Sequence, residues 1–173
     1  MVRWADREDL EIVAELERLC FSIPWSSAAI EEAFSNELYR FAVVEEKGKV
    51  VGYANFRIVA DEGEIERVAV HPDSRRRGYG RKLMEAMVDY ARKKGVRDMT
   101  LDVRVNNEKA INLYESCGFA EEGRRKDYYR EPTEDAILDR QLFSAAITDY
   151  SFQLSVTFVF PHLILTFLKS TFP

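Results

Sequence analysis

The sequence has few cysteines, few glycines and prolines for its length, and no excess of positive charge. Its two cysteines, Cys20 and Cys117, lie far apart, which excludes a disulfide framework and a cysteine-based metal site. The two histidines, His71 and His162, have no ligand or base partner nearby in the sequence, so we expect no metal site. A formal net charge of -5 argues against general nucleic-acid binding, which needs a basic surface.

The start of the chain lacks a secretion signal, because residues 1–10 carry mixed charges and no apolar stretch. Together with the two unpaired cysteines, this favours a cytoplasmic protein. A length of 173 residues suits one domain. The composition, 46% hydrophobic and 32% charged, is ordinary for a globular protein and excludes neither an enzyme nor a binding module.

Hydrophobic periodicity and turn residues predict a single α/β or α+β domain with the element order β-α-α-β-β-β-α-β-α-β. We expect strands over 2–5, 41–45, 50–59, 64–70 and 99–105, helices from about 6, from about 26, over 78–94 and over 108–116, and an extended segment from 119. The first helix has one apolar face that we expect to be buried, made of Leu10, Val13, Leu16, Leu19 and Cys20.

The last segment, 143–173, differs in composition from the rest and forms a hydrophobic tail. Between Asp149 and Lys169 it carries no charged residue, a span close to the ~20 residues of a membrane helix. Polar residues and a proline interrupt this span, and apolar residues alternate over 154–160 as in a strand. A packed or poorly ordered appendage is therefore favoured over a membrane anchor, and its role is not predicted.

A strand, a glycine-containing loop and a helix follow one another over 68–83. The first turn of a helix has unpaired backbone N–H groups and a partial positive charge, which suits the diphosphate of coenzyme A. Gly78 and Gly80 let phosphate oxygens approach the backbone. The residues expected to form this site are Arg75, Arg76, Arg77, Gly78, Tyr79, Gly80 and Arg81, with further charge from Lys82.

This loop has neither the ending of a Walker loop nor the third glycine of the dinucleotide fingerprint, which argues against a kinase or a dehydrogenase. Taken alone, it is also compatible with a solvated basic turn. Its pattern Arg75-x-x-Gly78-x-Gly80, after a strand that ends in Val70-His71-Pro72, resembles motif A of the GNAT acetyltransferases. The context of strand and helix makes this resemblance specific.

A second block, over 101–107 and 110–119, resembles motif B of the same superfamily, most closely the ribosomal-protein-alanine N-acetyltransferases of RimI type. Three further segments are similar to that subgroup, at 21–26, 124–129 and 134–136. The resemblance implies a GNAT-like domain over 1–142, with a mixed central sheet flanked by helices. The residues 137–140 depart from the apolar ending of that family, which predicts an altered final strand.

The resemblance also implies a mechanism, in which an amine attacks acetyl-CoA directly without an acyl-enzyme. Tyr114 would protonate the leaving thiolate, since a phenol with a pKa near 10 is protonated at neutral pH, and Asn107 would contact the cofactor. The backbone of Val68, Ala69 and Val70 would pair with the pantetheine arm, with the N–H of Val70 or Val68 as oxyanion donor. On helix spacing alone, Tyr114 is also compatible with a buried aromatic residue.

The general base has two candidates. RimI-type enzymes carry a glutamate at the position of Asp102, whose shorter carboxylate can act through a bound water. Glu66, on the strand before the cofactor loop, lies where other GNAT enzymes place a catalytic glutamate. Each is also compatible with a solvated or ion-paired strand residue.

The acceptor that the resemblance favours is a protein N-terminus, the N-terminal alanine of a small-subunit ribosomal protein. An α-amine is easier to deprotonate than a lysine, with a pKa of about 7.7–8.0 against about 10.4. Aromatic segments, formed by Tyr128 and Tyr129 with Phe21, Pro24 and Trp25, would line a groove for an extended peptide. Two alternatives stay open: a GNAT enzyme for a small amine such as a polyamine, amino acid or aminoglycoside, and a non-catalytic acetyl-CoA-binding module. The sequence does not predict the oligomeric state.

Overall fold

A computed structural model describes residues 1–143, and the expectations for residues 144–173, including the tail, its possible membrane anchor and His162, lie outside the described residues. The strands are β1 (Val2–Trp4), β2 (Tyr39–Glu46), β3 (Lys49–Val59), β4 (Glu62–Val70), β5 (Asp98–Arg104), β6 (Ala120–Arg130) and β7 (Thr133–Leu142). The helices are η1 (Arg7–Asp9), α1 (Leu10–Cys20), α2 (Ser27–Ser35), η2 (Pro72–Ser74), α3 (Tyr79–Lys93) and α4 (Glu108–Ser116). No helix among residues 1–143 is long and apolar enough to span a membrane.

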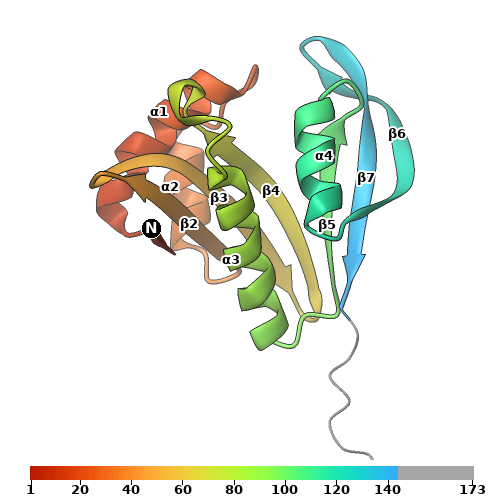
Figure 1. Ribbon diagram of the computed structural model, residues 1–173, viewed down its shortest axis with the longest axis horizontal. Coiled ribbons are helices and arrows are strands. Elements are labelled where there is room, and N and C mark those ends of the chain that lie inside the picture. The colour runs from red at the N-terminus through yellow and green to blue at the C-terminus, as the bar shows by residue number, and fades with distance from the viewer. Residues whose placement is uncertain (144–173) are drawn as a thin grey trace, which may run out of the picture. The chain divides into compact units, whose positions relative to one another are not determined.

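The strands form one mixed sheet in the order β1-β2-β3-β4-β5-β7-β6. Only β4 and β5 pair in parallel, and α3 connects them, as a parallel pair requires a crossover. Figure 1 shows these two strands meeting at their N-terminal ends and diverging toward their C-terminal ends. This divergence positions the functional site.

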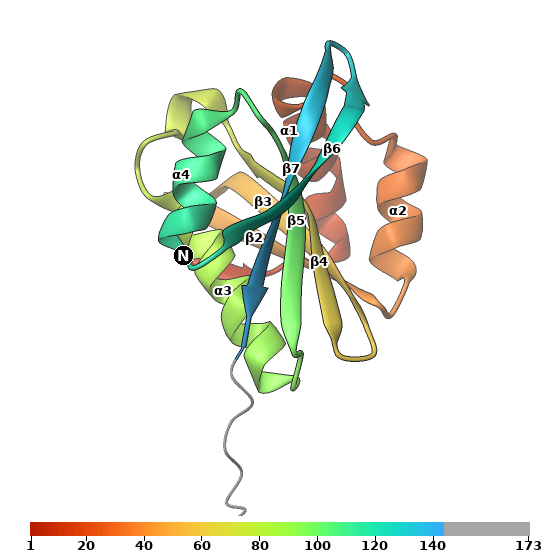
Figure 2. The same cartoon turned by 90° about the vertical axis from the view of Figure 1, so that its right-hand side faces the viewer.

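Helices cover both faces of the sheet, with α1 and α2 on one face and α3 and α4 on the other (Figure 2). Each helix layer has its own apolar core. One core contains Val13, Leu16, Ile30, Phe41 and Tyr53. The other contains Phe56, Leu83, Met84, Met87, Met99 and Leu101.

The N-termini of the helices are capped by the residue types that the sequence places there. Asp6 accepts a hydrogen bond at the start of η1, which leads into α1, and Ser26 caps α2. On α1, the prediction that Leu19 is buried is wrong, since 47% of this residue is exposed. At 3.6 residues per turn Leu19 lies about 120° from Val13, and the buried position is taken instead by Glu17.

The final strand is not altered as the sequence led us to expect. β7 pairs continuously with β5 from Ala136 to Leu142, although this stretch includes the buried polar residues Asp139 and Gln141. Phe143, which follows the strand, is also buried, and its N–H donates to the Arg97 carbonyl at 2.8 Å.

Candidate active site

The site originates where β4 and β5 separate. Their parallel pairing runs from Glu62 and Asp98 to Ile65 and Leu101 and ends there. At this point β4 contains one residue more than its partner β3, because Phe56 pairs with Ile65 whereas Asn55 pairs with Arg67. Glu66 is therefore the extra residue of a β-bulge, which bends the strand and increases its twist.

Beyond the bulge, the backbone of β4 has a free side toward β5. The N–H of His71 donates to the Val51 carbonyl at 2.8 Å, which makes Gly52 and Val70 a non-hydrogen-bonded pair of β3 and β4. By strand alternation the N–H and C=O groups of Ala69 point to β3, and those of Val68 and Val70 point to the diverging side. This is the orientation needed to pair with an extended ligand.

A cavity of about 790 Å³ lies at the divergence. It is lined by nearly all the residues that the sequence predicts: Glu66, Val68, Ala69, Val70, Arg75, Arg76, Gly78, Tyr79, Gly80, Arg81, Asp102, Asn107 and Tyr114. Arg77 is not among the lining residues, because its guanidinium pairs with Glu46 at 2.6 Å.

At one end of the cavity, which we call the donor end, α3 presents its N-terminus. Gly78 is the N-cap with a φ of 80°, a left-handed conformation that glycine adopts without strain, and no side chain caps the helix. The first N–H groups of α3 are thus available to an anion. Gly80 leaves little space between α3 and α4, since a Cβ atom at this position would lie 3.0 Å from Leu113 Cδ2. The absence of a side chain therefore keeps this space open.

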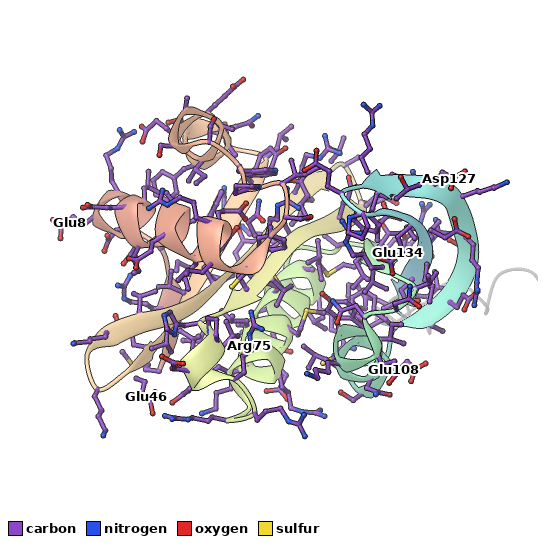
Figure 3. The ribbon with its side chains drawn as sticks, turned by 90° about the horizontal axis from the view of Figure 1, so that it is seen from above. Glu8, Glu46, Arg75, Glu108, Asp127 and Glu134 are labelled. Atoms are coloured by element: carbon purple, nitrogen blue, oxygen red, sulfur yellow. The ribbon has the colours of Figure 1, made fainter. Side chains whose placement is uncertain are left out.

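The arginines of the donor end are held in different ways. Arg75 Nε donates to the Val70 carbonyl at 3.0 Å, and Arg81 donates to Ser116 Oγ at 2.8 Å, which links α3 to the end of α4. Figure 3, seen from above, shows Arg75 on the α3 side and Glu108, the first residue of α4, on the opposite side. Arg75 and Arg81 both line the cavity, and Arg81 also bridges α3 and α4.

The half-buried Tyr114 lines the cavity from α4, where its ring packs edge-on against Phe119 at 6.5 Å. Burial raises the pKa of its phenol, so the hydroxyl stays protonated and can donate. Asn107, the N-cap of the same helix, accepts from the Ala110 N–H at 3.3 Å through its side chain, which fixes the start of α4. Both predicted residues thus reach the cavity.

The two candidate bases also line the cavity, one from each diverging strand. Burial raises the pKa of Glu66, and the hydrogen bond from the Tyr39 hydroxyl, at 3.2 Å, opposes this shift. Burial likewise raises the pKa of Asp102, opposed mainly by the positive charge of Arg125, whose Nε lies 3.2 Å from Oδ1. A carboxylate with a raised pKa is a better proton acceptor, so both groups suit a general base.

The other end of the cavity, which we call the acceptor end, carries residues that the sequence did not identify. Arg104 on β5 donates to Ser22 Oγ at 3.2 Å and to the Glu131 carbonyl at 2.9 Å, and so ties the α1–α2 loop to the turn between β6 and β7. Arg67 on β4 also lines this wall. No local pattern marks these arginines, because their partners are remote in the sequence.

The predicted aromatic groove is formed in part. Phe21, Tyr128 and Tyr129 line the cavity, whereas Pro24 and Trp25 do not. The Tyr129 hydroxyl donates to the Asp102 carbonyl at 3.1 Å, and burial raises the pKa of this phenol to about 12. The acceptor end therefore combines aromatic rings with two carboxylates and two arginines.

Comparison with known proteins gives one consistent result. The model of the Acetyltransferase (GNAT) family matches residues 10–119. The chain is 37% identical over 132 residues to the [ribosomal protein bS18]-alanine N-acetyltransferase of Escherichia coli (strain K12), covering 75% of this chain and 88% of that protein. It is 35% identical over 141 residues to the N-alpha-acetyltransferase RimI of Mycobacterium tuberculosis, covering 78% and 87%. The crystal structure of the ribosomal-protein-S18-alanine N-acetyltransferase from Escherichia coli superposes with a TM-score of 0.79 at 33% identity, covering 86% of this chain and 97% of that one.

Proposed function

Because the chain belongs to the GNAT acetyltransferase family, we propose that it acetylates the N-terminal α-amine of a protein, specifically the N-terminal alanine of a small-subunit ribosomal protein. The chain is an N-acetyltransferase, and acetyl-CoA is its acetyl donor. The proposal assigns this activity to residues 1–142 and places the reaction in the cytoplasm. The Escherichia coli relative named for this substrate supports it, since the chain covers 88% of that protein.

The observation that carries the proposal is the end of the β4–β5 pairing at Ile65 and Leu101. The cavity that opens there joins an anion-binding helix N-terminus at one end to carboxylates and aromatic rings at the other. A long donor with a diphosphate and an amine acceptor can therefore meet within it. Val68 and Val70, whose N–H groups point to the diverging side of β4, also line the cavity.

The chain's residues divide three tasks. A carboxylate, Asp102 or Glu66, takes a proton from the acceptor amine, directly or through water. The N–H of Val70 or Val68 stabilises the negative charge that develops on the acetyl oxygen when the amine attacks. Tyr114 donates its proton to the departing thiolate, and its raised pKa keeps that proton available at neutral pH.

The acceptor end fits an α-amine better than a lysine side chain. A single carboxylate of raised pKa suffices for a group whose own pKa is about 7.7–8.0, whereas a lysine at about 10.4 is harder to deprotonate. The walls formed by Phe21, Tyr128 and Tyr129 offer apolar contact to the residues that follow the amine.

The test is acetyl-CoA turnover, measured as free thiol release, with a peptide that begins with alanine and with the same peptide blocked at its N-terminus. We expect turnover with the free amine and none with the blocked peptide. Turnover of spermidine but of neither peptide would replace the proposal by a small-amine acetyltransferase. Acetyl-CoA binding without turnover of any amine would replace it by a non-catalytic module.

A further inference from the structure

A buried carboxylate lies behind the acceptor end. Glu17 on α1 is 0% exposed, although burial of an unpaired charge is strongly unfavourable. It is satisfied by the Trp25 N–H, which donates to Oε2 at 2.6 Å, and by the Tyr53 hydroxyl, which donates to Oε1. Oε1 also lies 3.5 Å from Arg67 Nε. One glutamate therefore connects α1, β3, β4 and the α1–α2 loop.

This network fixes the side chain of Arg67. Its guanidinium carbon lies 4.7 Å from the centre of the Phe21 ring and 5.1 Å from that of the Trp25 ring, so two aromatic residues of the α1–α2 loop hold it against Glu17. The side chain is 22% exposed and lines the cavity. Arg67 follows the bulge residue Glu66, so a permanently charged group lies next to a candidate base.

The residues 1–143 leave the hydrogen-bonding capacity of Arg67 unused. A guanidinium has five N–H donors, and among residues 1–143 none of them makes a hydrogen bond of good geometry, the Glu17 contact included. A fixed donor group facing a cavity is suited to an oxygen acceptor such as a carbonyl. A polyamine offers no oxygen acceptor to such a donor group.

We propose that Arg67 is a specificity-determining residue that binds a backbone carbonyl oxygen of the first two residues of the acceptor peptide, and that Glu17 is its positioning residue. This inference rests on the proposed function, because it requires a peptide acceptor. It gives a means by which the cavity would select a peptide over a polyamine: the peptide carbonyl pairs with Arg67, and a polyamine has no oxygen with which to do so.

The experiment combines substitution of the enzyme with substitution of the substrate. Wild type and Arg67→Met are compared on an alanine-initiated peptide and on two analogues, in which a trans-alkene replaces the first or the second peptide bond and so removes one carbonyl. For wild type we expect one analogue to lose roughly 10- to 100-fold in kcat/KM, as for a hydrogen bond to a charged group. Arg67→Met should lose a similar factor on the peptide and no longer discriminate against that analogue.

The controls separate specificity from folding. Arg18→Met, at an exposed position of α1, should behave as wild type. Glu17→Gln keeps the shape but removes the charge, and it should raise the KM for the peptide several-fold and leave the KM for acetyl-CoA unchanged. Equal changes in both KM values would indicate a structural role only and would overturn the positioning role of Glu17.

Two failures are distinguishable. If wild type acetylates the peptide and Arg67→Met still discriminates against the analogue, or wild type does not discriminate at all, the role of Arg67 is wrong and the proposed function stands. If wild type acetylates spermidine and not the peptide, the proposed function fails, and the inference fails with it.

Discussion

The donor end and the acceptor end of the cavity are built in different ways. The donor end is one continuous stretch, the loop over 75–78 and the start of α3, and it acts largely through backbone N–H groups. The acceptor end is assembled from side chains remote in sequence, such as Arg104 and Ser22, which are 82 residues apart. A site made of backbone groups tolerates many side chains but needs its glycines, whereas a site made of side chains depends on the long-range packing that brings them together.

The largest expected effect on kcat comes from substitution of Tyr114, which lies between the donor end and the acceptor end. Tyr114→Phe removes the hydroxyl that we propose protonates the thiolate, but keeps the ring that packs against Phe119. We expect kcat to fall about 100-fold, as for loss of a general acid, with little change in either KM or in the thermal unfolding temperature. Steady-state kinetics with both substrates measures this. An unchanged kcat would show that Tyr114 is not the proton donor to the thiolate.

The base at the acceptor end comes next. Replacing the base, by Asp102→Asn or Glu66→Gln, should lower kcat/KM by about 100-fold at most. A base acts when ionised, so activity falls as the pH drops through its pKa, and burial moves that fall to higher pH for either carboxylate. Asp102 and Glu66 each have one neighbour that lowers the carboxylate pKa, Arg125 and Tyr39 respectively. Replacing each neighbour and measuring the pH profile of kcat/KM therefore identifies the base.

If Asp102 is the base, Arg125→Met should move the acidic fall of kcat/KM to higher pH, because the positive charge that lowers the pKa of Asp102 is lost. Tyr39→Phe should then have no such effect. If Glu66 is the base, Tyr39→Phe removes the hydrogen bond that lowers the pKa of Glu66. The acidic fall of kcat/KM should then move to higher pH in Tyr39→Phe and stay in place in Arg125→Met. A profile that neither substitution moves would exclude both carboxylates as the titrating base.

The contrast between a donor end built from one continuous stretch and an acceptor end built from remote residues also explains what the sequence could predict. The element order as far as α4, the α3 helix and the glycine loop follow from local periodicity, turn residues and spacing, so they were predictable within one or two residues. The single extended segment expected from 119 is instead two strands, β6 and β7. The position of β7 between β5 and β6 was not, because strand order depends on contacts remote in sequence. For the same reason the sequence could not show that Arg75 reaches the cavity while Arg77 pairs with Glu46, nor that Glu17 and Arg67 form a network.

A smaller effect is expected at the donor end. Gly80→Ala places a methyl group where phosphate oxygens would approach, near the movable Leu113 side chain. We expect the KM for acetyl-CoA to rise roughly tenfold while the KM for the peptide is unchanged, because a displaced diphosphate loses bonds to the helix N-terminus. Gly123→Ala on β6, where a Cβ atom meets nothing within 4 Å, serves as the control. A rise in the peptide KM instead would show that the two ends are not independent.

The smallest effect concerns the sheet that supports the acceptor end. Two buried aspartates, Asp98 on β5 and Asp139 on β7, differ in whether their carboxylates are paired. Asp98 accepts from Arg97 Nε at 3.0 Å, whereas Asp139, only 2% exposed, has a buried Oδ2 without a hydrogen-bond partner among residues 1–143. Burial, with the negative charges of Glu115 and Glu121, raises the pKa of Asp139. Its ionised form is therefore destabilising at neutral pH.

Asp139→Asn should accordingly increase the free energy of unfolding by about 1 kcal/mol at pH 7, a rise of about 3 °C in unfolding temperature. Since the native state binds the proton of Asp139 more tightly than the unfolded state, the wild type should become more stable as the pH falls through this raised pKa. The advantage of the variant should therefore shrink as the pH falls through the raised pKa of Asp139, which thermal unfolding at several pH values measures. Asp98→Asn should be destabilised instead, because it removes the buried carboxylate charge that pairs with Arg97 Nε at 3.0 Å. A constant difference between wild type and Asp139→Asn at all pH values would mean that Asp139 does not titrate with a raised pKa.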